Sequence, residues 1–336
     1  MSENQAQQIR DLIVVGAGPT AIAIGAEAAK AGIDCLLIDR GPLCGAMVDF
    51  PVGMNFFTTR DKLEIAGIPF AIPDEKPSRQ QALVYYQGVA RAYDLDVAPY
   101  EEVHSAVRQG ETFVVTTKQR SGETVERRAR AVVLATGYFG HPKALGVPGE
   151  ELPWVSLRYR EPYLHYDQDV VVVGGGNSAC EAALDLWRNN VRVTLLVRKP
   201  GLKPTVKYWV KPDVENRVAE GSIAAHFEAT VEAFRGDGEI VVSQGGTTRV
   251  LRADAAYVLI GYLPDADLER RCGIELDATT LVPVFDPTTL ESNVPGLFVA
   301  GTLQAGHDTG KIFIENSRDN GERIVGHLLA RGLGGS

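Results

Sequence analysis

The chain has 336 residues, of which 45% are hydrophobic and 23% charged, a length that predicts two domains. The net charge is -9 and basic residues are scattered among acids, which disfavours nucleic acid or an anionic membrane as the main partner. Residues 1–11 are polar and lack an apolar targeting core, and no apolar run reaches membrane-spanning length. We therefore expect a cytoplasmic protein.

The first predicted elements form a strand–helix–strand unit. Residues 12–15 are apolar, as in a strand buried on both faces, residues 19–31 predict a helix, and residues 35–38 predict a second strand. This strand ends in Asp39, about twenty residues beyond the first glycines, where a carboxylate can accept hydrogen bonds from a ribose. The unit predicts a dinucleotide site in preference to a ligand-free βαβ unit.

The turn between the first strand and the helix reads Gly-x-Gly-x-x-Ala. Gly16 permits the tight turn, Gly18 lets a pyrophosphate approach the backbone, and Ala21 lets the helix lie close to the sheet. The helix begins at Pro19 and aims its first amides at the phosphates. The pattern therefore places a pyrophosphate at this helix terminus.

A loop rich in glycine, proline and aromatic residues follows Asp39 and contains Arg40, Cys44 and Asn55. Its aromatic and hydroxyl residues can cover a flat ring, although they can equally pack on the core. Beyond the loop the pattern predicts a proline-spaced connector over 69–77, a helix over 79–93 capped by Ser78, antiparallel strands over 103–107, 112–118 and 124–130, and a buried strand from 131 that ends at Thr136 and Gly137.

The opening pattern is repeated over residues 169–197. A strand over 170–173 leads into a second Gly-x-Gly-x-x-Ala turn, followed by a helix over 180–189 and a strand over 193–197. The turn contains Gly174, Gly176, Asn177, Ser178 and Ala179. The chain therefore has two predicted dinucleotide units.

The second unit ends in Arg198 and Lys199, where the first unit has Asp39. An arginine can bind a 2'-phosphate through two hydrogen bonds, whereas an acid would repel it, and Lys203 is close enough in sequence to help. The second site is therefore interpreted as an NADPH site, the alternative for Arg198 being a solvated charge. The first unit, with its acid, is typical of FAD, to which the nicotinamide would deliver a hydride.

The remaining pattern predicts a helix over 214–220 and strands over 227–234, 239–243, 248–251, 255–260 and 297–301. Residues 309–316 are expected to open the last helix, which ends near Arg331. The amides of that helix terminus would stabilise negative charge on a reduced flavin. Alternatively, the helix only covers the sheet.

Four cysteines are present, at positions 35, 44, 180 and 272, without a Cys-x-x-Cys pair or metal-ligand spacing. No metal site is expected. Cys44 is the candidate redox thiol because its loop can approach the flavin, although an inert loop thiol is the alternative. Cys35 and Cys180 are expected to be buried, and Cys272 to be peripheral.

With these motifs, the chain resembles the low-molecular-weight thioredoxin reductase family over nearly its whole length. Within that family it is most similar to the YpdA-type bacillithiol disulfide reductases. Residues 55–59, 206–213 and 310–316 carry this narrower resemblance. The resemblance implies FAD, NADPH and a homodimer formed through the FAD domains.

The implied fold class is α/β, with two Rossmann-like (three-layer ββα/βαβ) dinucleotide-binding domains in a thioredoxin reductase-like arrangement. The NADPH domain, residues 156–260, is inserted in a split FAD domain, residues 1–155 and 261–336. The predicted FAD residues are Gly16, Gly18, Pro19, Thr20, Ala21, Asp39, Arg40, Asn55, Thr136, Gly137, Gly301, Thr302, Lys311 and Ile312. The predicted NADPH residues are Gly174, Gly176, Asn177, Ser178, Ala179, Arg198, Lys199 and Lys203.

The chain departs from its relatives in three respects. Thioredoxin reductases carry a redox Cys-x-x-Cys pair in the inserted domain, where the region after Ala179 offers only Cys180. Thr20 stands where bacillithiol-type relatives have a cysteine, and Thr302 stands where thioredoxin reductases have an aspartate. A hydroxyl cannot cycle through a mixed disulfide. We expect hydride transfer from NADPH to FAD and then reduction of a low-molecular-weight disulfide or a redox protein. The alternatives are a ferredoxin or flavodoxin reductase, a diaphorase or NADPH oxidase, and an NADPH-sensing flavoprotein.

Overall fold

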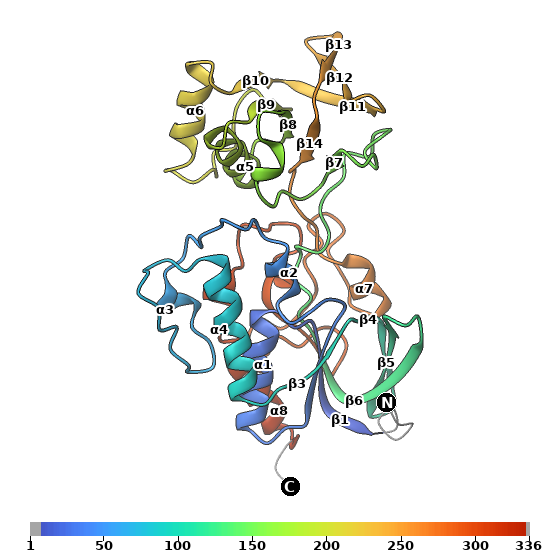
Figure 1. Ribbon diagram of the computed structural model, residues 1–336. Coiled ribbons are helices and arrows are strands. Elements are labelled where there is room, and N and C mark those ends of the chain that lie inside the picture. Colours follow the sequence, from blue (N-terminus) through green and yellow to red (C-terminus); the bar gives the residue numbers. More distant parts are fainter. Residues whose placement is uncertain (1–7, 334–336) are drawn as a thin grey trace. The chain divides into compact units, whose positions relative to one another are not determined.

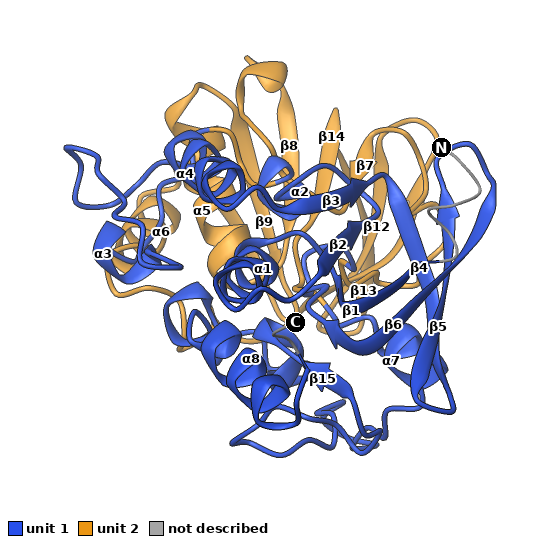
Figure 2. Cartoon of the chain, turned by 90° about the horizontal axis from the view of Figure 1, so that it is seen from below, with its two compact units in different colours: residues 1–49, 53–141, 263–336 blue, residues 50–52, 142–262 orange. Residues whose placement is uncertain are grey.

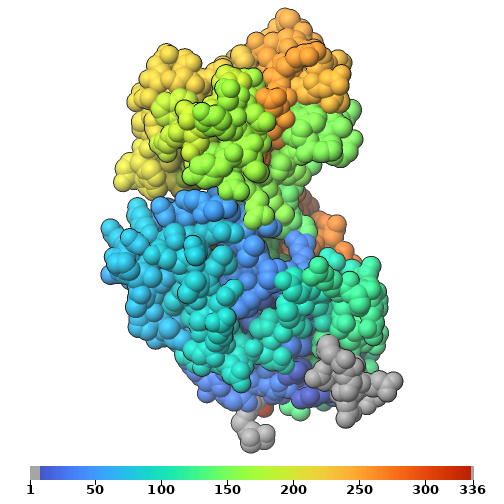
Figure 3. All heavy atoms as spheres, in the orientation of Figure 1, coloured from blue at the N-terminus to red at the C-terminus, as the bar shows by residue number. Residues whose placement is uncertain are grey.

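The computed structural model describes residues 8–333, and the chain divides into two compact units (Figure 1, Figure 2). Unit 1 comprises residues 1–49, 53–141 and 263–336, and unit 2 comprises residues 50–52 and 142–262. In the space-filling view, unit 2 is made of the green-to-orange middle of the chain, whereas unit 1 combines residues from both ends (Figure 3). Unit 2 is therefore an insertion in unit 1.

The boundary between the first segment and the insertion differs from the predicted one. We expected it near residue 155, whereas residues from Pro142 onward belong to unit 2. Trp154 packs edge-on against Phe234, with ring centroids 5.7 Å apart, and the Phe234 amide donates to the Pro148 carbonyl at 2.9 Å. These contacts attach residues 142–155 to unit 2.

Unit 1 is built on a seven-stranded sheet in the order β3-β2-β1-β6-β5-β4, with β15 also paired to β6. β1 is parallel to β2 and β6, while β4, β5 and β6 form an antiparallel ladder. A single strand, β6, replaces the two strands predicted over 124–130 and from 131. The strands are β1 (Ile9–Val15), β2 (Cys35–Asp39), β3 (Asp96–Pro99), β4 (Glu101–Gln109), β5 (Thr112–Gln119), β6 (Thr124–Leu134) and β15 (Leu297–Val299).

The longest helices of unit 1, α1, α4 and α8, lie beside the sheet, with α1 in contact with both others (Figure 1). At the start of α4 a capping box forms: Ser78 Oγ accepts from the Gln81 amide at 3.2 Å, and Gln81 Oε1 accepts from the Ser78 amide at 2.8 Å. The helices are α1 (Pro19–Lys30), α2 (Gly45–Val48), α3 (Arg60–Leu63), α4 (Arg79–Ala92), α7 (Ala266–Arg271) and α8 (Asn320–Ala330), with 3-10 turns η3 (Gly301–Ala305) and η4 (Ile314–Asn316).

Unit 2 contains a five-stranded parallel sheet in the order β10-β9-β8-β14-β7 and a three-stranded antiparallel sheet, β11-β12-β13. The strand predicted over 227–234 is broken at Glu228, which has a left-handed φ of 55°. The elements are β7 (Val155–Ser156), η2 (Tyr163–His165), β8 (Asp169–Val173), α5 (Asn177–Arg188), β9 (Arg192–Val197), α6 (Lys211–Ala219), β10 (Ala224–Phe227), β11 (Ala229–Arg235), β12 (Glu239–Gln244), β13 (Thr247–Arg252) and β14 (Ala255–Val258).

The last helix begins later than predicted. α8 starts at Asn320, and residues 309–316 contain only the short turn η4. Asn316 holds this turn, because its Oδ1 accepts from the Phe313 amide at 2.7 Å and its Nδ2 donates to the Lys311 carbonyl at 2.8 Å. Such side-chain bonds compete with helix formation. The expected helix terminus at 309–316 is therefore wrong.

Within residues 8–333, no helix is both long and apolar enough to cross a membrane.

A buried acid, Glu269, lies on α7. Its side chain is 1% exposed, and neither carboxyl oxygen has a hydrogen-bond partner among the described residues. Burial, with a smaller contribution from Asp265, raises its pKa to about 8 from the ordinary 4.5. The folded chain therefore holds Glu269 protonated near neutral pH.

We predict that the parent chain loses stability as the pH rises from about 5 to about 8. Glu269→Gln should largely remove this loss. In that range the unfolded chain releases a proton that the folded chain keeps, so the free energy of unfolding falls as pH rises and levels off above the folded pKa. At about pH 8 the variant should be more stable by on the order of 4 kcal/mol.

Urea unfolding across this pH range measures the effect. Glu102→Gln, at an exposed position on β4, is the control and should leave the pH dependence of the parent chain unchanged. Parallel stability curves for the Glu269 variant and the parent would show that the buried carboxyl carries no such cost.

Candidate functional site

The first glycine turn joins β1 to α1 in unit 1. Gly16 has a φ of +116°, and a Cβ at this position would collide with the Ala135 carbonyl beyond the end of β6. Gly18 caps α1, with nothing within 4 Å of where its Cβ would lie. Pro19 is the first helical residue, where its missing N–H costs nothing. The turn therefore leaves open space in front of the amides of α1, as a pyrophosphate requires.

Asp39 is fixed at the end of β2 by two backbone amides. Its Oδ2 accepts from the Ala17 amide and its Oδ1 from the Gly41 amide, both at 2.7 Å. Each oxygen retains acceptor capacity, since a carboxylate oxygen has two lone pairs. The acid is therefore oriented beside the glycine turn and can still bind ribose hydroxyls.

Arg40 packs over Gly140 and lies beside His141, with Arg40 Nη1 3.4 Å from His141 Nε2. The same imidazole nitrogen lies 3.4 Å from Asp265 Oδ2. This contact is the largest cause that lowers the pKa of Asp265. Arg40 is thus held against the loop that follows β6.

Two hydroxyls lie where β6 and β15 end. Thr136 Oγ1 and Thr302 Oγ1 are buried and have no hydrogen-bond partner among the described residues. They belong to one neighbourhood, since a Cβ on Gly137 would lie 3.7 Å from Thr302 Oγ1. A buried hydroxyl without a partner costs about 1–3 kcal/mol. Both belong to the predicted FAD set, and a polar ligand that reaches them would remove this cost.

The hydroxyl of Thr20, at the start of α1, makes a hydrogen bond to a residue outside that helix. Its Oγ1 lies 3.3 Å from Ser317 Oγ, and Ser317 Oγ donates to the Phe313 carbonyl at 2.7 Å. Because Ser317 has one hydroxyl proton, Thr20 is the donor of the first bond. Thr20 also touches Gly301, whose Cβ would lie 3.0 Å from its Oγ1. The hydroxyl is committed to joining α1 to the segment before α8.

Asn320 is a site residue that the sequence pattern does not reveal. It is 1% exposed at the start of α8, and its Oδ1 accepts from the Gly301 amide at 2.9 Å and from Gln304 Nε2 at 2.7 Å. Gly301 has a left-handed φ of +66°. Asn320 and Ser317 both lie in a stretch that the sequence predicts as helix, where asparagine and serine are expected as caps. Only the tertiary structure shows that Asn320 holds the turn after β15.

The remaining predicted FAD residues lie in exposed segments of unit 1. Asn55 is exposed and its backbone forms an isolated bridge with Ser78. Lys311 is exposed and pairs with Asp308 at 3.3 Å, while Ile312 is partly buried. The residues after Asn55 and Ile312 meet, because the Phe57 and Phe313 rings pack edge-to-face at 5.3 Å. These two loops are therefore brought together, as the ring-covering interpretation requires.

Cys44 lacks the properties of a redox thiol. Its side chain is completely buried, its backbone is left-handed with a φ of 58°, and its amide donates to the Ala17 carbonyl at 2.9 Å. Burial, with a contribution from Asp39, raises the pKa of its thiol to about 12. A thiolate is the reactive form, so the structure supports the inert interpretation.

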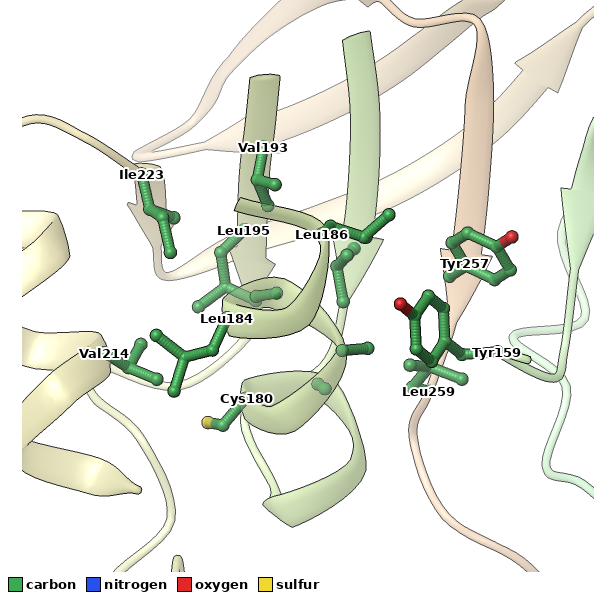
Figure 4. Packing of buried hydrophobic residues seen from close by; sticks show 14 of the residues in the cluster. Tyr159, Cys180, Leu184, Leu186, Val193, Leu195, Val214, Ile223, Tyr257 and Leu259 are labelled. Carbon is green, nitrogen blue, oxygen red and sulfur yellow. The ribbon is translucent and has the colours of Figure 1, made fainter. Parts of the chain in front are cut away.

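The other cysteines are also protonated. Burial raises the pKa of Cys180 to about 12 and of Cys272 to about 11, and it raises that of Cys35 as well. Cys35 is nevertheless only partly buried, which differs from the prediction. Cys180 lies on the same side of α5 as Leu184, the side that faces Val214 (Figure 4). Cys272 is 4% exposed, so the prediction of a peripheral position is wrong. Its Sγ accepts from the Ala106 amide at 3.2 Å because α7 packs on β4.

The second glycine turn joins β8 to α5 in unit 2. Gly174 has a φ of +141°, and a Cβ there would collide with the Leu259 carbonyl. Gly176 caps α5, and the Lys203 side chain lies over it, with Nζ 3.9 Å from the position of a Cβ. The Lys203 amide also donates to the Gly175 carbonyl at 2.8 Å. Lys203 thus adds a positive charge at the helix terminus.

The first turn of α5 is tied to the loop before α6. Asn177 Oδ1 accepts from the Lys207 amide at 2.9 Å, and its Nδ2 donates to the Thr205 carbonyl at 3.3 Å. Ser178 is exposed and Ala179 is buried. Asn177 is therefore a residue that shapes the loop, whereas Ser178 faces the solvent.

Arg198 and Lys199 are exposed immediately after β9. Neither side chain makes a hydrogen bond or an ion pair with any of residues 8–333. By contrast, Arg192 at the start of the same strand pairs with Asp167 and Asp169. The carboxyl end of β9 therefore presents cations that are available to an anionic ligand.

Comparisons with known proteins agree with this geometry. The chain is 36% identical over 321 residues to bacilliredoxin reductase Bdr from Bacillus subtilis, covering 95% of this chain and 97% of that protein. The structure of a bacillithiol disulfide reductase, Bdr (YpdA), from Bacillus cereus superposes with a TM-score of 0.93 at 34% identity, covering 96% of this chain and 100% of that one. A ferredoxin–NADP reductase from Ignicoccus hospitalis is 25% identical over 88% of this chain and 90% of its own length.

The predicted fold class and the predicted resemblance are both confirmed by these matches. The model of one family, described as pyridine nucleotide-disulphide oxidoreductase, matches residues 13–301, which contain both glycine turns and end at the Gly301 turn. With two Rossmann-like units of this kind, the chain belongs to the pyridine nucleotide-disulphide oxidoreductase family.

Proposed function

We propose that this chain is an NADPH-dependent, FAD-containing oxidoreductase that reduces a low-molecular-weight disulfide. The observation that carries the proposal is the contrast between the two glycine turns. Asp39 is oriented beside the first turn by two amides, whereas exposed cations follow the strand beside the second. An acid suits the ribose of FAD, and an arginine suits the 2'-phosphate of NADPH.

The residues of unit 1 fit FAD. The open face of Gly18 and the amides of α1 would receive the pyrophosphate, and Asp39 would bind the ribose. The buried hydroxyls of Thr136 and Thr302 offer donors for a polar chain in the same unit. Because Thr302 stands where related reductases carry an aspartate, its unpartnered hydroxyl is the group that can replace that contact. A bound flavin supplies a two-electron carrier between nicotinamide and acceptor.

The residues of unit 2 fit NADPH. Lys203 lies over Gly176 at the terminus of α5, where it would neutralise the pyrophosphate. Arg198 would bind the 2'-phosphate through its planar guanidinium, and Lys199 would add a point charge. Neither side chain has an ion-pair partner within residues 8–333, so neither must break such a contact to do so.

The acceptor class follows from the relatives, whose names specify a bacilliredoxin reductase and a bacillithiol disulfide reductase. The overall reaction is balanced as disulfide plus NADPH and a proton giving two thiols and NADP+. Among residues 8–333 no thiol has the lowered pKa that a mixed disulfide needs, because burial raises the pKa of all four cysteines, and Thr20 has only a hydroxyl, which donates to Ser317. We therefore propose that the acceptor disulfide is reduced without a covalent bond to the protein.

A ferredoxin or flavodoxin reductase is the second candidate. The buried cysteines favour it, since such a reaction needs no thiol, and a relative bears the ferredoxin–NADP reductase name. The identity to that relative is lower, at 25% against 36%. The disulfide acceptor is therefore preferred, while the homodimer and the cytoplasmic location stay predictions.

We predict that the purified protein contains FAD, that NADPH bleaches it anaerobically, and that a low-molecular-weight disulfide restores the flavin absorbance. Stopped-flow absorbance measures both half-reactions, and a thiol assay counts two thiols for each NADPH. Ferredoxin, flavodoxin, quinone and oxygen are offered in parallel. Faster reoxidation by ferredoxin or flavodoxin than by every disulfide would overturn the disulfide assignment.

Arg198→Ala should raise the KM for NADPH by about ten-fold or more, because it removes a charge-assisted phosphate contact. The KM for NADH should change little, since NADH lacks the 2'-phosphate. Arg252→Ala, at an exposed position on β13, is the control and should leave both values unchanged. An equal rise for both nucleotides would contradict the assignment of Arg198 to the 2'-phosphate.

Cys44→Ala should leave disulfide turnover within about a factor of two, because its protonated thiol takes no part in the reaction. After reduction by NADPH, iodoacetamide should not label Cys44, as peptide mass spectrometry can test. Cys180→Ala, a buried cysteine of unit 2, is the matched control. Rapid labelling of Cys44, or lost turnover at unchanged flavin content, would restore it as the redox thiol.

A further inference from the structure

A contact in unit 1 joins the two segments that flank the first glycine turn. β2, β1 and β6 are adjacent and parallel, so their carboxyl ends lie at one edge of the sheet. Arg40 directly follows β2, and its guanidinium lies against Gly140 and His141, which follow β6. The end of β1, where the turn begins, lies between these two strands. The contact therefore connects the two sides of the predicted FAD site.

Gly140 provides the space that Arg40 occupies. A Cβ at Gly140 would collide with Arg40 Nη2, so any other residue would displace the guanidinium. Arg40 is exposed and has no carboxylate partner within residues 8–333. Its position is therefore set by the loop after β6, with Arg40 Nη1 3.4 Å from His141 Nε2.

A single imidazole nitrogen faces two groups with opposite requirements. His141 Nε2 lies 3.4 Å from Arg40 Nη1 and also 3.4 Å from Asp265 Oδ2. A guanidinium only donates hydrogen bonds, an ionised carboxylate only accepts them, and a ring nitrogen either donates or accepts. His141 Nε2 can therefore bind Arg40 or Asp265, but not both at once.

The protonation of His141 decides between these two partners. In a neutral imidazole with its proton on Nδ1, Nε2 accepts from Arg40, whereas an imidazolium donates to Asp265 and repels the guanidinium. The pKa of Asp265 lies below its ordinary value, with the His141 contact as the largest cause, so the carboxylate is ionised. Its other oxygen, Oδ1, accepts from the Leu268 amide at 3.0 Å, which orients Asp265 at the start of α7.

The other ionisable groups on these segments keep their charge in the range where histidine ordinarily titrates. Burial raises the pKa of Glu269 to about 8 and raises the pKa of Tyr138, so both are mainly neutral between about pH 5.5 and 7.5. The groups that stay charged are Asp39, Lys143, Asp267, Arg270 and Arg271. His141 is therefore the group whose charge changes.

We propose that His141 is a positioning residue for FAD, which holds Arg40 across the site when neutral and releases it when protonated. With the Arg40–His141 bond made, the segments after β2 and β6 are joined on both sides of a dinucleotide at the first glycine turn. The bond must break before FAD leaves, so release is faster at low pH. This inference rests on the proposed function, which assigns FAD to unit 1.

Release of FAD from the holoenzyme, followed by flavin fluorescence after dilution, tests the role of His141. The release rate should rise by about ten-fold from about pH 7.5 to pH 5.5 in the parent chain, because a hydrogen bond to a charged group is lost. His307→Gln, at an exposed histidine of unit 1, is the matched control and should keep this rise.

Two variants should remove the pH dependence in opposite ways. His141→Gln should release FAD slowly at both pH values, because an amide accepts from Arg40 and donates to Asp265 without titrating. Arg40→Leu should release it rapidly at both. A parent rate that does not change with pH, or an unchanged pH dependence in His141→Gln, would overturn the role of His141.

A second measurement needs no flavin. In 15N spectra of the ligand-free chain at about pH 7.5, the neutral His141 ring should carry its proton on Nδ1, and a proton on Nε2 would contradict the bond to Arg40. The signal is assigned by its loss in His141→Gln. A chain that binds no FAD would contradict the proposed function, whereas bound FAD with pH-independent release would contradict only this inference.

Discussion

The close approach of each glycine turn to the end of a neighbouring strand is the constraint on which both units depend. At Gly16 the Cβ direction is filled by the Ala135 carbonyl, and at Gly174 it is filled by the Leu259 carbonyl. Both residues have a positive φ that residues other than glycine rarely adopt. Only this backbone lets the strand pass directly into a helix whose first amides point at the same edge of the sheet.

Around this shared constraint the two units diverge through a few side chains. In unit 1 the space beside the turn is organised by side-chain bonds to backbone, with Asp39 fixed by amides and Asn320 holding the Gly301 amide. In unit 2 the corresponding space is bordered by side chains that carry charge, above all Lys203. Under the proposed function, the fixed polar contacts of unit 1 suit a resident cofactor and the exposed cations of unit 2 suit an exchanging one.

The parts of the fold that local chemistry dictates could be predicted from the sequence. The strands and glycine turns of both units belong to this class, because their apolar runs and φ requirements lie within a few residues of one another. The edge strand β3 could not be predicted, since its four residues include an aspartate and a proline, which are rare in strands. The sequence predicts two strands in place of β6, because the pattern changes from alternating to continuous where the partner on one side changes from β5 to β15.

Errors in the candidate site arose from contacts between distant residues. The loop position of Cys44 suggests exposure, and only the packed α2 region shows that it is buried. Residues 309–316 follow the last strand, where a covering helix is expected, but the side chain of Asn316 binds the local backbone and leaves a single 3-10 turn. Thr20 lies at the start of α1, as the sequence predicts, yet its bond to Ser317 spans 297 positions and leaves no trace in the local sequence.

The burial of the cysteines has a consequence for chemical durability. Peroxide oxidises thiolates far more readily than thiols, first to sulfenic acid and then irreversibly to sulfinic and sulfonic acids. In Cys44, Cys180 and Cys272 the sulfur is both protonated and shielded from solvent. At these three positions the chain offers oxidants little to attack, unlike an enzyme built on an exposed thiolate.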